Sequence, residues 1–284
     1  MVIRYIKADV PGVDELGLPE VYKTMIMRKK GLILVVGATG MGKSTSLASM
    51  LDYRNMTEHG HILTIEDPIE FMFRHKKCIV SQREVGLDTL SFDNALREAM
   101  REAPDVIMIG ESRDRETMAA ALRFADTGHL CITTLHATNA YQTLDRLLNF
   151  FPSDVHNQAL MDLSLNLNCI LAQRLIKSED GSRVAAIEVL VNTPYISKLI
   201  RDGNFHEIKD IMEKGSDTGM QTFDQSLLKL YQAGKINLKS ALANADSSSE
   251  LEWKINFGGG VTQKPNDENK NQTLEFPDSS AELE

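Results

Sequence analysis

The segment GATGMGKSTS, residues 37–46, constrains this chain more than any other part of its sequence. Gly37, Gly42, Lys43 and Ser44 satisfy the pattern G-x-x-x-x-G-K-[ST], whose glycines let backbone N–H groups turn toward a phosphate. An apolar run precedes the segment and a helical pattern follows it, so the phosphates would lie at a helix N-terminus. The order strand, loop, helix predicts a P-loop α/β domain that binds a nucleotide.

The same pattern predicts a role for each residue of the loop. We expect Lys43 to reach the β- and γ-phosphates of ATP and the hydroxyl of Ser44 to coordinate Mg²⁺. The residues expected to contact the nucleotide are Gly37, Thr39, Gly40, Gly42, Lys43, Ser44 and Thr45. The alternative is a glycine turn beside a surface lysine, and the strand and helix patterns on either side argue against it.

The segments around this loop alternate between apolar strands and amphipathic helices. We predict buried strands at residues 32–36, 61–65, 105–110 and 129–135. Ser91 and Asp114 are placed to cap two helices between these strands, and Gly128 is placed to end the second. This alternation predicts a mostly parallel sheet covered by helices on both faces.

From about residue 154 the pattern becomes helical. We predict one long helix over residues 154–176, a helix between Thr222 and Gly234, and a short helix near residues 238–245. Residues 258–284 are polar and Asn-rich, with six acidic and two basic side chains, and are predicted to form a disordered tail.

Acidic residues follow two of the predicted strands. Glu66, Asp67 and Glu70 crowd into five residues after one strand, and Glu111 follows another. The carboxyl ends of parallel strands meet at one edge of a sheet, where ligands bind. Hydrolysis needs an acid on the metal side and a group that orients the attacking water, and these acids are candidates for both. Taken singly, each of them could instead be a solvated loop carboxylate.

Two histidines flank the fourth predicted strand. His129 and His136 are separated by seven residues of extended chain, roughly 23 Å, which is too far to share a metal ion. His136 lies at the same sheet edge as the acids and could sense the γ-phosphate or a neighbouring subunit. His129 lies at the opposite end, and a structural role is favoured there.

The net charge and the cysteine spacing argue against two classes of protein, nucleic-acid motors and zinc-binding proteins. The formal net charge is −9 with a single Trp, whereas a nucleic-acid motor carries a basic surplus and aromatic surfaces. Cys78, Cys131 and Cys169 form no C-x-x-C pair, which argues against a zinc site and fits a reducing cytoplasm. We find no signal peptide and no apolar run of about 18 residues, so membrane contact is expected only through a partner.

Four segments resemble, in order and spacing, the motifs of the secretion-type ATPases that drive type IV pili and type II secretion. They are GATGMGKST as the phosphate loop, ILTIEDPIE as the Asp box, IMIGESRD as the Walker B segment and TGHLCITTLHAT as the His box. The similarity runs from residue 1 to about residue 257 and is greatest to the PilT/PilU retraction ATPases. Segments such as CIVSQREVGLDTLSF and GMQTFDQSLLKLY are more similar to PilU than to PilT.

The resemblance implies a RecA-like core, a homo-hexameric ring that hydrolyses ATP between subunits, and work on an inner-membrane pilus platform protein. It implies that Glu70, or else Glu66, activates water, that Glu111 serves Mg²⁺ and that His136 reads the nucleotide state. The segment at residues 192–205 differs from the retraction motif of PilT, which implies an accessory role beside a PilT-type paralogue. In this picture the protein is cytoplasmic, peripheral at the inner membrane, and binds no nucleic acid.

The resemblance also implies a domain arrangement. Residues 1–12 resemble the last strand and linker of a PAS-like N-terminal domain that is largely missing here. Residues 13–192 are expected to form the ATPase domain, and residues 193–257 a smaller helical region. The PAS-like domain implies arginines that complete the nucleotide site of a neighbouring subunit, with Arg4 as the candidate here and His129 as a second possible trans-acting residue.

Other functions stay open at this stage. A regulatory ring subunit that binds ATP with little activity is one alternative, against which the intact Lys43, Glu70 and Glu111 argue. A nucleic-acid motor is the alternative from another class, and a binding test with single-stranded DNA separates it from a pilus motor. The assembly and secretion ATPases of the GspE/PilB type carry a tetracysteine zinc insertion that has no counterpart here.

Overall fold

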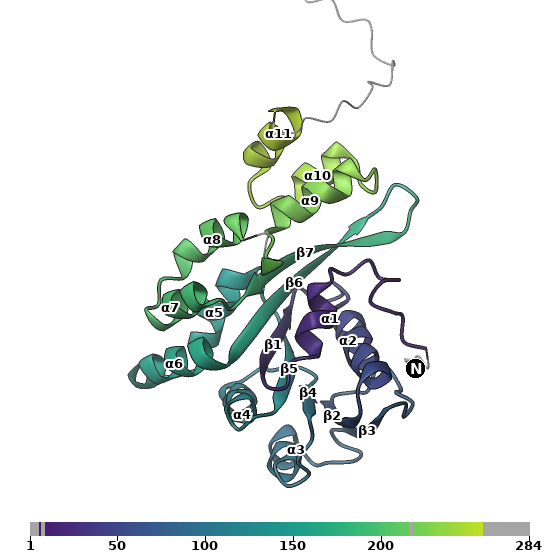
Figure 1. The fold of residues 1–284 in the computed structure, drawn as a ribbon, viewed down its shortest axis with the longest axis vertical. Coiled ribbons are helices and arrows are strands. Elements are labelled where there is room, and N and C mark those ends of the chain that lie inside the picture. Colours follow the sequence, from purple (N-terminus) through teal and green to yellow (C-terminus); the bar gives the residue numbers. More distant parts are fainter. Residues whose placement is uncertain (1–5, 7–8, 216–217, 258–284) are drawn as a thin grey trace, which may run out of the picture.

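The structure, a computed structural model, describes residue 6, residues 9–215 and residues 218–257. Its centre is a seven-stranded sheet in the order β3-β2-β4-β5-β1-β6-β7 (Figure 1). The strands are β1 (Gly31–Val36), β2 (Gly60–Glu66), β3 (Cys78–Glu84), β4 (Val106–Ile109), β5 (Leu130–Leu135), β6 (Leu167–Lys177) and β7 (Arg183–Val191). All neighbouring strands are parallel except β6 and β7. The predicted mostly parallel α/β fold is therefore confirmed.

The central strands are buried over their whole length. Every residue of β1, β4 and β5 is buried, which matches the continuous apolar runs of their sequences. A parallel strand with helices on both faces has no solvent-facing side, so it needs no alternation of polar and apolar residues.

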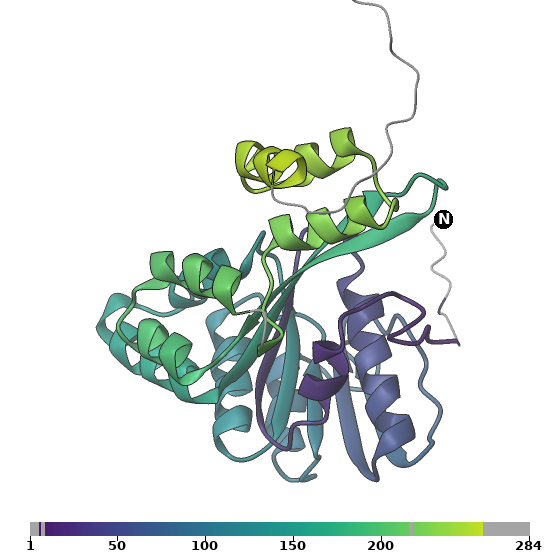
Figure 2. The same ribbon diagram turned by 45° about the horizontal axis from the view of Figure 1, so that its top comes forward.

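Helices cover both faces of the sheet (Figures 1 and 2). The helices of this part are α1 (Val21–Ile26), α2 (Lys43–Thr57), α3 (Phe92–Ala99), α4 (Arg115–Asp126), α5 (Ala140–Leu148), the short 3₁₀ helix η1 (Ser153–Val155) and α6 (His156–Asn166). The connection through α2 runs one way along the sheet and those through α3 and α4 run the other way. Because such crossovers are right-handed, α2 lies on one face and α3 and α4 on the other.

The predicted helix caps are present. The side chain of Ser91 accepts a hydrogen bond from the backbone of Asn94 at 3.2 Å, and that of Asp114 from the backbone of Thr117 at 2.9 Å. Each cap satisfies an N–H group that a helix start leaves without an internal partner. These two helix starts were readable from the sequence because their signals are local.

The predicted long helix over residues 154–176 is wrong. Helix α6 ends at Asn166, and the chain continues as β6, which is parallel to β1 and antiparallel to β7. The apolar residues from Leu167 onward fit a helical repeat as well as a buried strand, and pairing with two other strands decides between them. The sequence reasoning also missed β3 and β7.

The C-terminal helices are α7 (Pro194–Arg201), the 3₁₀ helix η2 (Phe205–Glu207), α8 (Ile208–Lys214), α9 (Phe223–Gln232), α10 (Leu238–Asn244) and α11 (Ser248–Phe257). Helices α9 and α10 contact the β6–β7 hairpin at the top of Figure 1, and α11 packs on them. Helices α7, η2 and α8 pack on one another and on α5 and α6. Of the C-terminal helices, α9 and α10 are those predicted after Thr222 and near residue 238. Phe223 and Leu251 are fully buried in the same apolar core as the strands, so these helices share that core.

Some of the sequence-based predictions concern residues that the structure does not describe. Arg4 and the tail at residues 258–284 lie outside the described residues, as does most of the segment at residues 1–12. The expected boundary at residue 193 falls between β7 and α7. Within the described ranges, every helix is too short or too polar to span a bilayer.

Candidate nucleotide-hydrolysis site

The phosphate loop connects the end of β1 to the start of α2. Gly40 and Gly42 adopt left-handed backbone angles, with φ of +78° and +81°, which residues with a Cβ rarely adopt. Gly37 also has a positive φ, +155°, and a Cβ atom there would in addition lie 2.6 Å from the carbonyl oxygen of Gln173 on β6. The glycines of the motif are thus needed for the loop to turn tightly against the neighbouring strand.

Lys43 is buried, with 9% of its surface exposed, and its ammonium group lies inside the loop. Its Nζ donates to the carbonyl oxygens of Gly37 at 2.9 Å and Ala38 at 3.1 Å. Burial lowers the pKa of Lys43, while the nearby carboxylates of Glu111 and Glu70 raise it. A positive charge held in the loop by carbonyl groups is suited to exchange those contacts for phosphate oxygens.

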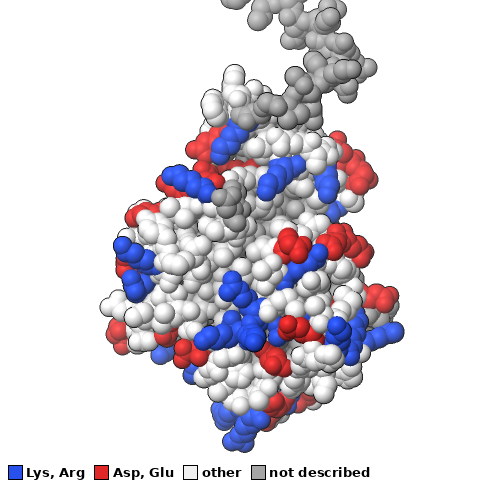
Figure 3. Space-filling view, in the orientation of Figure 1, with Lys and Arg blue, Asp and Glu red and all other residues white. Residues whose placement is uncertain are grey.

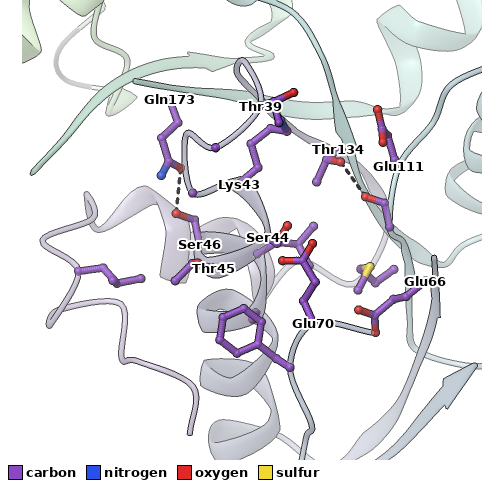
Figure 4. A pocket seen from close by; sticks show the side chains of 18 of the residues that line it. Thr39, Lys43, Ser44, Thr45, Ser46, Glu66, Glu70, Glu111, Thr134 and Gln173 are labelled. Atoms are coloured by element: carbon purple, nitrogen blue, oxygen red, sulfur yellow. Dashed lines mark hydrogen bonds between the residues drawn. The ribbon is translucent and has the colours of Figure 1, made fainter. Parts of the chain in front are cut away.

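The two acids after β2 occupy different surroundings. Glu66 is buried and accepts hydrogen bonds from Thr64 Oγ1 at 2.7 Å and from Gln82 Nε2 at 3.2 Å. Burial raises the pKa of Glu66, and the two side-chain hydrogen bonds oppose that change. Glu70 is exposed and lines the cavity next to Lys43 (Figure 4). Glu66 is therefore engaged with the protein, whereas the Glu70 carboxylate faces the space where a substrate would lie.

Glu111 and His136 meet across the ends of β4 and β5. His136 Nε2 lies 2.8 Å from a carboxylate oxygen of Glu111, and its Nδ1 lies 3.4 Å from Lys43 Nζ. The other carboxylate oxygen of Glu111 accepts from Arg113 Nε at 2.8 Å. The phosphate loop, the acid after β4 and the histidine after β5 are therefore joined in one chain of contacts.

A cavity of about 1,090 Å³ brings these groups together. Its lining includes loop residues, the acids after β2 and β4, and His136. The volume lies slightly above the usual range for small-molecule and cofactor sites, about 300–1,000 Å³, and is enough for a nucleotide. Residues Pro11, Glu15 and Leu16 of the N-terminal segment also reach it.

Of the predicted catalytic and nucleotide-contacting residues, all but Gly37 line this cavity. Those that line it are Thr39, Gly40, Gly42, Lys43, Ser44, Thr45, Glu66, Glu70, Glu111 and His136. His129 lies apart, at the other end of β5, where its ring packs edge-on against Phe124 with centroids 5.8 Å apart.

One residue of the cavity was not found by sequence reasoning. Gln173 on β6 accepts a hydrogen bond from Ser46 Oγ at 2.8 Å, and its amide nitrogen lies 3.0 Å from the position of a Cβ on Gly42. It therefore supports the phosphate loop from the neighbouring strand (Figure 4). No motif marks it, and the mistaken helix over this segment placed it on the wrong kind of element.

The oxygen atoms near the phosphate loop could serve as ligands for a magnesium ion bound together with a nucleotide. Mg²⁺ prefers oxygen ligands and is usually held by one or two protein groups plus phosphates and waters. Ser44, in the first turn of α2, offers a hydroxyl, and Glu111 offers a carboxylate in the same cavity. In the described part of the chain, no three or more His, Cys, Asp or Glu side chains gather into a metal site.

Comparison with known proteins gives a consistent result. Residues 2–242 match the family model described as type II/IV secretion system protein. The type IV pilus ATPase PilU of Pseudomonas aeruginosa is 56% identical over 259 residues, which cover 91% of this chain and 68% of that protein. The type IV pilus retraction ATPase PilT of the same organism is 47% identical over 86% of this chain and 71% of its own length.

Solved structures agree with the sequence relatives. The crystal structure of the pilus retraction motor PilT with bound ADP matches with a TM-score of 0.83 and 47% identity, covering 88% of this chain and 71% of that one. The ATPase DotB of Legionella pneumophila matches with a TM-score of 0.76 and 30% identity, covering 85% of this chain and 68% of that one.

Proposed function

The chain belongs to the type II/IV secretion ATPase family, and we propose that it is an ATP-hydrolysing motor subunit for type IV pilus retraction. The observation that carries this proposal is the joined set of Lys43, His136 and Glu111 in a cavity that also exposes Glu70. Its relatives at 56% and 47% identity are named as pilus ATPases, which supports the same assignment.

Each group in the cavity has a task in phosphoryl transfer to water. Lys43 holds the β- and γ-phosphates, as the lysine of a phosphate loop does. Glu70 accepts a proton from the water that attacks the γ-phosphorus, and ADP leaves from the opposite side. Ser44 and Glu111 would hold Mg²⁺ together with the nucleotide, and the ion would neutralise charge on the phosphates.

His136 is suited to report whether the γ-phosphate is present. It lies between the ammonium of Lys43 and the carboxylate of Glu111, both of which change partners when a nucleotide binds. A side chain tied to both groups must move when either of them moves. This links hydrolysis to a displacement of the chain after β5.

The assembly and its partners are part of the proposal. We infer a homo-hexamer that acts on a pilus platform protein at the inner membrane, beside a PilT-type paralogue in the accessory PilU role. The higher identity to PilU than to PilT supports that role. The inferred division into an ATPase domain at residues 13–192 and a helical region at residues 193–257 belongs to the same proposal.

The nucleic-acid motor is the less favoured function. Figure 3 shows acidic and basic side chains interspersed on one face, with acidic side chains beside the basic group near the centre of the view. A strand-binding channel needs a positive groove lined with aromatic platforms. The single Trp, Trp253, lies on α11, away from the cavity.

The test is ATP turnover by the purified chain over a wide range of concentrations, with the particle mass measured at each point. Turnover that rises with assembly and is abolished by Lys43→Ala supports a motor whose sites are completed between subunits. Nucleotide binding without turnover at any concentration would instead support a regulatory ring subunit. Stimulation by single-stranded DNA would support the nucleic-acid motor.

A further inference from the structure

Two consecutive residues of β6, Gln173 and Arg174, contact different parts of the molecule. Successive side chains of a strand point to opposite faces of the sheet. Gln173 contacts Ser46 at the phosphate loop, whereas Arg174 points to the C-terminal helices. The strand therefore connects the nucleotide cavity to the helical region through neighbouring positions.

Arg174 is the centre of the contacts with the C-terminal helices. Its guanidinium donates to the carbonyl oxygen of Asn244 and to the carboxylate of Asp246, both at 2.7 Å. The same group lies 3.8 Å from the ring centroid of Phe223, a fully buried residue at the start of α9. A planar guanidinium can make such stacking and hydrogen-bonding contacts at once, which a lysine cannot.

The segment held by Arg174 is fixed to α9 as well. The buried carboxylate of Asp224 accepts backbone hydrogen bonds from Asp246 at 2.7 Å and from Ser247 at 3.2 Å. The link between α10 and α11 is thus bound on one side to α9 and on the other to the sheet. A shift of Arg174 would move this link.

The same hairpin also holds the chain that follows His136. Arg174 Nη2 lies 3.5 Å from the carbonyl oxygen of Thr138, and the buried Glu188 on β7 accepts a hydrogen bond from the backbone of Ala140 at 2.6 Å. These contacts fix the start of α5, only two to four residues after the histidine of the nucleotide cavity.

Space for movement exists beside these contacts. A cavity of about 360 Å³ lies between the start of α5 and the helical region. Its lining residues are Asn139, Tyr141, Glu188, Lys209, Met212 and Asp246. The cavity leaves open space on one side of the chain after His136, although Ala140 itself is buried in the core.

We propose that Arg174 is a positioning residue that couples the segment after His136 to helices α9–α11. A change of nucleotide at Lys43 and Glu111 displaces His136, and the displacement reaches the α10–α11 link through Thr138 and Arg174. The inference rests on the proposed function, since it needs a nucleotide-dependent His136. It adds an output surface, the C-terminal helices, to that function.

The test is hydrogen exchange of the whole chain measured by mass spectrometry, without nucleotide, with ADP and with a non-hydrolysable ATP analogue. Arg174→Met removes the guanidinium, and Asp246→Ala removes the carboxylate that accepts from it. Arg201→Met is the matched control, because Arg201 lies on α7 and contacts only Asp202, at 3.8 Å, among the described salt bridges. Thermal unfolding of each variant shows whether it is folded.

In the wild-type protein and in Arg201→Met, we expect nucleotide to change exchange both at residues 37–46 and at residues 238–251. In Arg174→Met and Asp246→Ala the change at 238–251 should be lost while that at 37–46 stays. Should Arg174→Met not fold, Asp246→Ala decides alone. Two results would overturn the coupling. In the first, nucleotide still changes exchange at residues 238–251 in the folded variants. In the second, nucleotide changes exchange at residues 37–46 of the wild-type protein but not at residues 238–251. Absence of any nucleotide effect at 37–46 would contradict the proposed function itself.

Discussion

The Nε2 nitrogen of His136 lies 2.8 Å from the Oε1 oxygen of Glu111, at the point where two parallel strands end. Its other ring nitrogen faces the ammonium of Lys43 at 3.4 Å. A lysine ammonium only donates and a carboxylate only accepts, so the neutral imidazole with its proton on Nε2 satisfies both neighbours. His136 thereby helps to set the positions of Glu111, the acid on the metal side, and Lys43, the lysine on the phosphate side, relative to each other.

Replacement of this histidine tests that relation. In His136→Ala, Glu111 loses one of the two donors that orient it and keeps Arg113. We expect turnover to fall about 10- to 100-fold, as for other partners that orient a metal-side ligand. Steady-state ATPase assays measure the effect. His206→Ala is the matched control, because that side chain is 80% exposed and lies in η2, far along the chain from the cavity. Equal activity of the two variants would contradict the role of His136.

The two acids after β2 can be separated by conservative substitution. Glu70→Gln removes the carboxylate that faces the cavity, and we expect kcat to fall by about 10²–10⁴-fold with ADP affinity unchanged. Glu66→Gln keeps an oxygen acceptor for Thr64 and should lower kcat much less. Turnover and ADP titrations on both variants measure this. A larger loss in Glu66→Gln than in Glu70→Gln would reassign the base to Glu66.

The sequence predicted those parts of the fold whose signals are local. Ser91 and Asp114 cap their helices as expected, and acidic residues after apolar strands meet at one sheet edge. Strand β6 was missed because its apolar residues have no strand-like alternation, and only its pairing with β1 and β7 makes it a strand. That error also hid Gln173 and Arg174, whose roles depend on which neighbours the strand brings together.

Glu188 makes the stability depend on pH. Burial raises the pKa of Glu188 from 4.5 to about 7. The folded state therefore binds a proton that the unfolded state has lost between these values, so this residue's contribution to the free energy of unfolding falls as pH rises from 4.5 to 7. By linkage the full change is on the order of 3–4 kcal/mol.

Glu188→Gln isolates this contribution, because glutamine keeps an oxygen acceptor for the backbone of Ala140 but does not titrate. We expect the variant to gain stability relative to wild type as pH rises from 4.5 to 7, with no further relative change above that range. Urea unfolding at a series of pH values measures the difference. A difference that does not vary with pH would show that Glu188 has an ordinary pKa.

Gly37 and Gly86 both have positive φ angles, +155° and +89°, but only Gly37 also lies against another main-chain atom. A Cβ at Gly37 would lie 2.6 Å from the carbonyl oxygen of Gln173, a main-chain atom in the sheet that cannot rotate away. At Gly86, φ is +89° and nothing lies within 4 Å of a Cβ, so alanine there meets only an unfavourable backbone angle. Both substitutions add a methyl group, but only the one at Gly37 brings it against another main-chain atom.

We expect Gly37→Ala to force the phosphate loop away from β6, at a cost of about 1–3 kcal/mol in strain, and to weaken ADP binding by roughly tenfold or more. Gly86→Ala should cost about 1–2 kcal/mol of folding stability from the left-handed backbone and leave ADP affinity unchanged, because the turn at residue 86 does not line the cavity. Calorimetric ADP titration and urea unfolding of both variants measure these effects. Unchanged ADP affinity in Gly37→Ala would mean that the contact with Gln173 yields without moving the loop, and that β6 does not determine the geometry of the phosphate site.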